Sequence, residues 1–333
     1  MSDASRPLTC LGIEGTAHTL GVGIVDSDCT VLASIRSEYV PTTGGIHPRE
    51  AAEHHATVAP ELVREALKAA KVGAKDVDVI AFSMGPGLGP CLRVAATVAR
   101  TLSCWLKKPL VGVNHCLAHI EIGRRLMNVV DPLTLYVSGG NTLVAGFDSG
   151  RYRIFGETLD ISVGNLLDVF GRDAGIPHPG GPKIEKLASI GKKFIALPYT
   201  VKGMDLSFSG LLTASSEILK SGKYRIEDLC YSLQEVAFSM LAEVTERALA
   251  HTEKKEVLLT GGVAANRRLQ QMISAISTEH EASFYIVPMA YAGDNGAMIA
   301  WTGLMEFKVG RTITVEESYV RPKWRLDGID VPR

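Results

Sequence analysis

Apolar and polar positions in the first third of the chain follow two different periods. Short apolar runs bounded by Gly, Asp and Ser predict three strands over residues 8–13, 19–25 and 30–39. A polar loop over residues 41–48 follows, and from residue 49 to 71 apolar side chains recur at helical spacing. This region therefore predicts an antiparallel three-stranded meander followed by a long helix.

Two strand–helix pairs complete this half of the chain. Residues 77–83 predict a short buried strand, and a helix follows the glycine- and proline-rich turn at 85–90 and runs to about residue 105. Residues 109–113 predict another buried strand. Leu117, Ile120 and Leu126 then repeat at helical spacing, so a helix should follow this strand directly.

The same order begins again near residue 133. It predicts a second meander over 133–137, 141–147 and 152–158, helices near 163–174, 182–190 and 226–251, and then strand 257–260, helix 264–277, strand 284–287 and helix 295–307. The sequence thus predicts an α/β protein of two related lobes, 1–130 and 131–310, around a central cleft, as in the actin, hexokinase and Hsp70 ATPase fold. Residues 311–333 are expected to form a tail that is irregular or contributes one edge strand.

Composition narrows the class of protein. The 333 residues are 46% hydrophobic and 21% charged, as in ordinary globular proteins. The six cysteines form no CxxC pair, which argues against a zinc ribbon or a disulfide framework, and no apolar run approaches the length of a membrane helix. We therefore expect a cytoplasmic protein with no membrane contact. The net charge of −1 predicts no strong overall attraction to nucleic acid, so a local patch or a partner would have to supply basic surface.

One pair of histidines stands out. His115 and His119 are four residues apart on the helix that follows strand 109–113, so one helix face presents both. Two imidazoles in this arrangement can bind one metal ion. The competing interpretation is a helix cap and an ordinary half-buried histidine. Asp294 directly precedes the predicted helix 295–307. Its carboxylate could lie beside the two histidines, or the residue could simply be the N-cap of that helix.

Four glycine-rich turns lie at ends of predicted strands or starts of helices, at 13–19, 138–142, 260–266 and 292–296. Glycine allows close approach of backbone, and a helix start favours an anion, so together they favour a nucleotide site. No GxxxxGK[ST] motif is present. Asp168, Lys183 and Glu185 flank a polar loop at 178–182, and they could equally be solvated surface charges. Tyr136 could be a core aromatic.

Taken together, these motifs resemble those of the archaeal and eukaryotic-type tRNA threonylcarbamoyladenosine synthases. That family, once labelled O-sialoglycoprotein endopeptidases, supplies the catalytic subunit of the KEOPS complex. The matching stretches follow the family order through nearly the whole chain: GIEGTAHT at 12–19, MGPG at 84–87, NHCLAHIE at 114–121, YVSGGNT at 136–142, HPGGP at 178–182, DLSFSG at 205–210, TGGVAAN at 260–266 and DNGAMI at 294–299.

The resemblance implies a role for each matched residue. His115, His119, Tyr136 and Asp294 would hold one metal ion. The substrate or nucleotide site would be lined by Tyr136, Val137, Ser138, Gly139, Gly140, Asp168, Gly181, Glu185 and Asn266. A mixed nitrogen and oxygen ligand set suits iron, our first expectation, or zinc. No catalytic acid or base is identified.

The resemblance also implies an activity, a metal-dependent acyl transfer to tRNA. The threonylcarbamoyl group of threonylcarbamoyl-AMP, made by a separate synthase, would pass to the exocyclic amine of the adenosine 3′ to the anticodon in tRNAs that read codons beginning with A, releasing AMP. Partners would be tRNA and the other KEOPS subunits, including a dimerising bridging subunit. Because the chain ends at Arg333, we expect the small protein kinase/ATPase of that complex to be a separate protein.

Three other functions remain to be weighed. A metallopeptidase would use the histidine pair, but Cys116 follows His115 where the HExxH motif has its general-base Glu. A small-molecule kinase of the actin-like fold usually carries an Asp in the first hairpin, where this chain has Glu14. A scaffold without enzymatic activity would not need the complete set of site residues.

Overall fold

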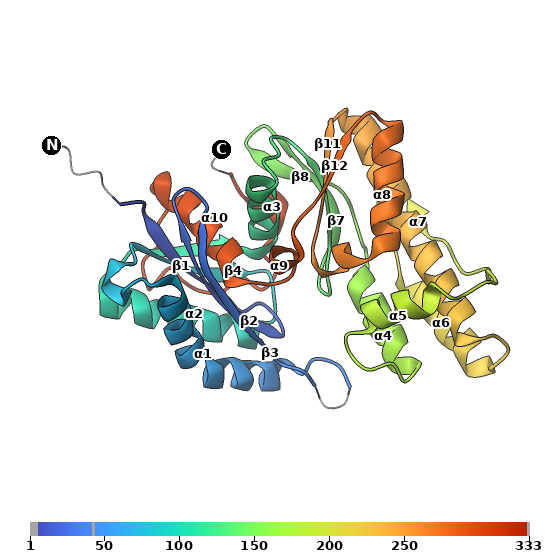
Figure 1. Ribbon diagram of the computed structural model, residues 1–333, viewed down its shortest axis with the longest axis horizontal. Helices are drawn as coiled ribbons and strands as arrows, with labels where there is room; N and C mark the ends of the chain where they lie inside the picture. Colours follow the sequence, from blue (N-terminus) through green and yellow to red (C-terminus); the bar gives the residue numbers. More distant parts are fainter. Residues whose placement is uncertain (1–5, 42–43, 332–333) are drawn as a thin grey trace. The chain divides into compact units, whose positions relative to one another are not determined.

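The computed structural model describes residues 6–41 and 44–331, so two residues of the predicted polar loop and both chain ends lie outside the described part. Contacts divide the chain into two compact units. The first runs to Leu126 and resumes at Asp294, and the second is Met127–Gly293. Figure 1 shows a sheet with flanking helices in each. No helix in the described ranges is long and apolar enough to cross a bilayer.

The first unit is built on a five-stranded sheet in the order β3-β2-β1-β4-β5. The meander pairs antiparallel, whereas β4 and β5 add in parallel to β1. β1 and β4 are buried along their whole length, as expected of strands covered on both faces. The strands are β1 (Thr9–Glu14), β2 (Thr19–Asp26), β3 (Val31–Glu38), β4 (Val79–Gly85) and β5 (Leu110–Asn114).

Helices cover both faces of this sheet. Leu11 and Ile13 of β1 belong to an apolar core shared with α1 (Pro48–Ala70) and α2 (Gly89–Leu106). The residue between them, Gly12, points the opposite way, because successive strand residues face opposite sides. A Cβ there would lie 2.2 Å from the backbone nitrogen of Ala300. The glycine therefore lets a helix backbone lie directly on the sheet.

That helix is α10 (Gly296–Lys308), and it belongs to the first unit. The order of elements along the sequence instead predicts this helix in the second lobe, residues 131–310. The difference has a packing cause: Gly21 and Gly23 of β2, like Gly12, have no side chain to separate the strands from α10. α3 (His115–Leu126), the turn η1 (Ala74–Asp76) and the turn η3 (Leu326–Gly328) complete this unit.

The second unit repeats the sheet arrangement, in the order β12-β11-β6-β7-β8. Its antiparallel meander again has two parallel strands added at one side, which confirms the predicted architectural repeat. The elements are β6 (Leu133–Val137), β7 (Thr142–Asp148), β8 (Arg151–Glu157), α4 (Val163–Asp173), α5 (Gly180–Ala188), β9 (Val201–Lys202), β10 (Asp205–Leu206), α6 (Ser209–Ser221), α7 (Ile226–Thr252), β11 (Glu256–Thr260), η2 (Gly262–Ala265), α8 (Arg267–Glu279), β12 (Ser283–Ile286) and α9 (Met289–Ala292).

Local differences from the predicted elements have clear causes. The helix predicted over 264–277 is divided into η2 and α8, because the Asn266 side chain accepts hydrogen bonds from the Arg268 and Leu269 backbone N–H groups and starts a new helix. At the start of α6, the Asp160 carboxylate accepts a hydrogen bond from the Ser209 N–H at 3.1 Å. The described part of the tail is largely irregular, which was one of the two predicted alternatives; it contains the turn η3 and isolated bridges, among them one from Ile313 to Leu110.

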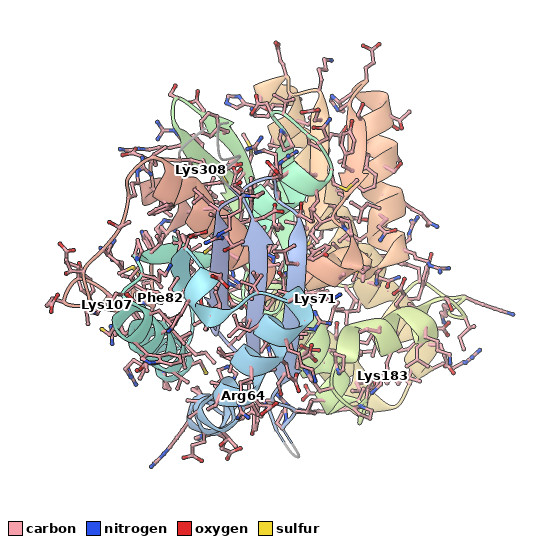
Figure 2. The ribbon with its side chains drawn as sticks, turned by 60° about the vertical axis from the view of Figure 1, so that its left-hand side comes forward. Arg64, Lys71, Phe82, Lys107, Lys183 and Lys308 are labelled. Atoms are coloured by element: carbon pink, nitrogen blue, oxygen red, sulfur yellow. The ribbon has the colours of Figure 1, made fainter. Side chains whose placement is uncertain are left out.

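The surface and the interior separate as the sequence suggests. Figure 2 shows Arg64 and Lys71, on and just after α1, with Phe82 of the first sheet. Arg64 is largely exposed and pairs with Glu61 one turn away, whereas Phe82 is fully buried. The core of the second unit is formed around the long helix α7, whose Leu233, Phe238 and Leu241 are all buried.

Candidate metal centre and substrate loops

The histidine pair is positioned by the junction between β5 and α3. β5 ends at Asn114, whose side-chain oxygen accepts a hydrogen bond from the Leu117 N–H at 3.1 Å. This cap starts the helix at His115, so both histidines fall in its first turns. His115 is 4% exposed, His119 is fully buried, and their ring centroids are 4.7 Å apart. The predicted common face of the pair is confirmed.

Asp294 completes a cluster of three possible ligands. Its Oδ1 lies 3.2 Å from His119 Nε2 and 3.6 Å from His115 Nε2. The interpretation of Asp294 as an N-cap is wrong, because the following residue, Asn295, caps α10 by accepting a hydrogen bond from the Met298 N–H at 2.9 Å. The Asp294 carboxylate is therefore available to the histidines. One ligand atom from each of the three residues lies within 4.8 Å of the others.

Glu14, at the end of β1, holds the first histidine in place. Its Oε2 lies 2.9 Å from His115 Nδ1, and its Oε1 accepts hydrogen bonds from the Thr16 N–H at 2.7 Å and hydroxyl at 2.6 Å. The side chain is fully buried. A carboxylate on Nδ1 orients the ring and leaves Nε2 toward Asp294, the arrangement that metal-binding histidines commonly have. Sequence reasoning missed this role, because the two residues are 101 positions apart.

The charges of this cluster oppose one another strongly. Burial favours neutral His115, but the carboxylates of Glu14 and Asp294 outweigh it and raise its pKa to about 9. Burial, together with the neighbouring imidazole of His115, lowers the pKa of His119. Burial alone would raise the pKa of Asp294, yet the two imidazoles hold it well below its usual range. Two carboxylates and two imidazoles thus share a space that a cation would balance.

The cluster fits a transition-metal ion by its chemistry. Two imidazole nitrogens and one carboxylate oxygen form a ligand set that both zinc and iron accept, with positions left for other ligands. Cys116, beside the pair, is not part of it, because the ligand atoms that lie close together come from His115, His119 and Asp294. Tyr136, the fourth expected ligand, lies in the second unit, where it is fully buried at the end of β6. Its part in metal binding stays a prediction.

In the second unit, the loop after β6 is shaped by hydrogen bonds to its own backbone. The Ser138 hydroxyl oxygen accepts from the Asn141 N–H at 3.0 Å, and the Ser162 hydroxyl donates to the Gly139 carbonyl at 2.5 Å. A Cβ on Gly139 or Gly140 would meet no atom within 4 Å. This turn is therefore fixed in shape, while its glycines leave open space into which another molecule could approach.

A second glycine turn lies beside it. β6 and β11 pair in parallel with Tyr136 opposite Thr260, so the turns at their carboxyl ends are adjacent. Gly261 has a φ of 95°, and a Cβ there would lie 2.1 Å from the Val137 carbonyl oxygen, so only glycine fits. Gly262 borders open space. The structure thus brings the predicted turns at 138–142 and 260–266 to one end of one sheet.

The remaining predicted residues of this unit hold loops together. Asp168 Oδ1 accepts a hydrogen bond from the Gly180 N–H at 2.7 Å, and Glu185 Oε1 accepts one from the Arg267 N–H at 2.8 Å. Asn266, in addition to capping α8, donates to Gln234 Oε1 at 2.8 Å. Gly181 lies in the first turn of α5. These polar groups have structural partners, so their contact with a substrate stays a prediction.

Solved structures place the molecule in the class of the actin-like ATPase fold. The chain resembles Thermococcus kodakarensis HypF with a TM-score of 0.65 and 17% identity, over 91% of this chain and 48% of that one. It also resembles the activator of 2-hydroxyisocaproyl-CoA dehydratase from Clostridium difficile, solved with bound ADPNP, with a TM-score of 0.55 and 11% identity over 92% and 100% of the two chains. At these identities the likeness shows the fold alone, and it confirms the predicted fold class.

Sequence comparison defines the family. Residues 30–301 match the family of TsaD, tRNA N6-adenosine threonylcarbamoyltransferase. A Thermococcus sibiricus protein of that name is 57% identical over 97% of this chain and 99% of its own length. A probable bifunctional tRNA threonylcarbamoyladenosine biosynthesis protein of Methanocaldococcus jannaschii is 58% identical over 97% of this chain, which spans 60% of that longer protein. The chain belongs to the tRNA N6-adenosine threonylcarbamoyltransferase family. This supports the transferase over the peptidase and kinase alternatives.

Proposed function

We propose that this protein transfers the threonylcarbamoyl group of threonylcarbamoyl-AMP to the exocyclic amine of the adenosine 3′ to the anticodon of tRNA. The observation that carries the proposal is the full-length likeness to relatives named for this transferase activity. The cluster of His115, His119 and Asp294 supports it, because those residues fit the metal that the family resemblance implies. The proposed location is the cytoplasm.

In the reaction, the adenosine amine nitrogen forms a bond to the carbamoyl carbon, the bond from that carbon to the phosphate oxygen breaks, and AMP leaves while the amine loses a proton. Negative charge builds on the carbonyl oxygen and on the leaving phosphate. A bound iron or zinc ion would supply Lewis-acid stabilisation of that charge. In the second unit, the backbone of Gly139, Gly140 and Gly262 would receive the adenylate, because these glycines border open space.

The other site residues of this chain would contribute by holding groups and loops in place. Glu14 would keep His115 Nε2 directed toward Asp294. Tyr136 and Val137, at the end of β6, would place the Ser138 turn beside Gly261. Asp168, Gly181, Glu185 and Asn266 would keep the surrounding loops closed on one another. No side chain is assigned as the acid or base.

The partners we propose are the other KEOPS subunits, including a bridging subunit and a protein kinase/ATPase, and a separate synthase that makes the adenylate. Relatives named bifunctional are longer than this chain, which is compatible with such a second component. The test combines threonine, bicarbonate, ATP, the synthase, tRNA and those subunits, with and without this protein, and measures threonylcarbamoyladenosine in digested tRNA by mass spectrometry. We expect product only with this protein. Its absence in the complete mixture would refute the proposal.

A further inference from the structure

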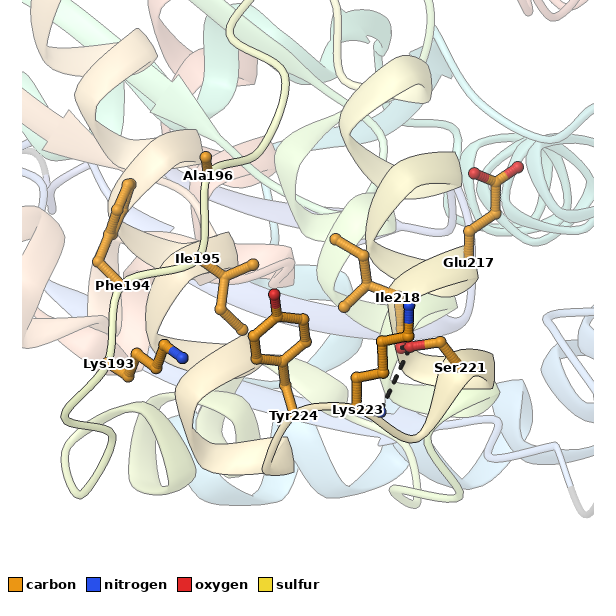
Figure 3. A pocket seen from close by; sticks show the side chains of 9 residues that line it. All are labelled: Lys193, Phe194, Ile195, Ala196, Glu217, Ile218, Ser221, Lys223 and Tyr224. Carbon is orange, nitrogen blue, oxygen red and sulfur yellow. Dashed lines mark hydrogen bonds between the residues drawn. The ribbon is translucent and has the colours of Figure 1, made fainter.

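A pocket in the second unit lies outside the substrate loops described above. It has a volume of about 460 Å³ and is lined by the segment before β9, the end of α6 and the lead into α7; its lining includes Lys193, Phe194, Glu217, Lys223 and Tyr224. Figure 3 shows these side chains around it. Its size is in the range of small-ligand sites. None of its residues carries a role in the proposed reaction.

The pocket lies in a basic part of a chain whose overall charge is −1. Residues 190–225 carry six Lys or Arg side chains against two acidic ones, a local excess of four positive charges. Lys192 and Lys193 come from one segment, while Lys220 and Lys223 come from the end of α6 and the turn after it. All four are exposed, and none of them forms an ion pair with a carboxylate of the described residues. Asp228, which accepts hydrogen bonds from the Lys192 and Lys193 backbone N–H groups, offsets part of this charge, and the exposed ammonium groups remain open to an anionic partner.

Exposed aromatic rings accompany these lysines. Phe194 is 54% exposed, Tyr199 48% and Tyr224 42%, so three large aromatics face solvent within 36 residues. Lys193 Nζ lies 5.3 Å from the centroid of the Tyr224 ring. Figure 3 shows the ammonium group of Lys193 on the side toward that ring, while the Glu217 carboxylate lies at the other side, on α6. A base that stacks on the ring would thus have its phosphate close to a cation.

We propose that this pocket binds an unpaired nucleotide of the tRNA substrate, with the base against Tyr224 and Phe194 and the flanking phosphates on Lys193 and Lys223. Exposed aromatic faces among lysines are the usual means of binding single-stranded nucleic acid without reading its sequence. An acidic protein segment would pair with the lysines but has no need of exposed aromatic rings beside them. The assignment rests on the proposed function, because only that function makes tRNA the substrate.

The test is the affinity of the full-length protein for labelled tRNA, measured by fluorescence anisotropy over a range of salt. Lys193→Glu with Lys223→Glu should weaken binding at least ten-fold and reduce the slope of log affinity against log salt by about 1.5, as loss of two phosphate contacts predicts. Tyr224→Ala should weaken binding about ten-fold, while Tyr224→Trp should restore it. The matched control is Lys68→Glu with Lys75→Glu, the same charge change at exposed positions of the first unit, which should change affinity less than two-fold.

Two further measurements make the result decisive. A single-stranded RNA should compete for the wild-type protein more strongly than a duplex of equal length, and this difference should be lost in Tyr224→Ala. Unchanged tRNA affinity in the pocket variants, with melting temperatures that show them folded, would overturn the assignment, whether or not they lose binding to another protein subunit. Failure of the proposed function is distinct, because then the wild-type protein itself would yield no modified adenosine.

Discussion

The two candidate sites of this protein are built by different means. In the first unit, the cluster consists of the buried side chains of His115 and His119 and the partly buried side chain of Asp294, and Glu14 fixes His115 from behind. In the second unit, the substrate loops present mainly backbone, because Gly139, Gly140 and Gly262 border open space. The comparison teaches that a small compact ion requires convergent side chains, whereas a larger nucleotide requires room and accessible N–H groups.

The largest effect should follow from removing a ligand of the cluster. His119→Ala or Asp294→Ala leaves two of the three donors, so metal content measured by elemental analysis should fall from about one ion per chain to near zero, and transfer activity with it. Cys116→Ala is the control, since that thiol neighbours His115 in the sequence but lies outside the cluster. It should retain the metal. Full occupancy in a variant that lacks both histidines would disprove the metal site.

Removing the support behind His115 should have the next largest effect. Glu14→Ala deletes the partner of His115 Nδ1 and should lower metal affinity about 10- to 100-fold, the usual range for such partners of metal-binding histidines. Glu14→Gln keeps an oxygen acceptor and should lose less. Competition titration with a metal chelator measures both. If Glu14→Ala bound metal as tightly as the wild type, the carboxylate would not be orienting the ring.

A pair of glycine substitutions compares the two units directly. Gly23→Ala would place a Cβ 2.2 Å from the Ala297 backbone nitrogen, so it should lower the free energy of unfolding by about 1–3 kcal/mol or more. The Cβ added by Gly262→Ala would meet no atom within 4 Å, so this substitution should change the free energy of unfolding by less than about 0.5 kcal/mol. Only Gly262→Ala should weaken adenine nucleotide binding at unchanged stability. Urea unfolding and calorimetry test this, and equal stability losses would contradict it.

The smallest expected effect is a pH dependence in the first unit. Burial, with the neighbouring His54, lowers the pKa of His55 from 6.5 to about 4. As the pH falls, His55 is protonated in the unfolded chain at a higher pH than in the folded protein. The folded protein therefore keeps its full stability above pH 6.5 and loses on the order of 2 kcal/mol of it as the pH falls toward 4. His55→Gln should remove that part of the pH dependence. Parallel curves of unfolding free energy against pH for both proteins would rule this out.

Much of the fold could be predicted from the sequence. The alternating runs near residues 9–39 and 133–157 gave both meanders, because strand periodicity and turn residues are local signals. The spacing of His115 and His119 likewise needed only the helix period. The order of elements predicted the actin-like fold, because the same succession of strands and helices occurs twice.

Other features were decided only by the tertiary structure. The assignment of α10 to the first unit depends on Gly12, Gly21 and Gly23 all facing one helix backbone, which no local pattern reveals. The contact of Glu14 with His115 joins residues 101 positions apart, and the lysines of the Tyr224 pocket come from separate segments. Periodicity acts over a few residues, whereas charge pairing, close backbone packing and pockets depend on chain segments that meet only after folding.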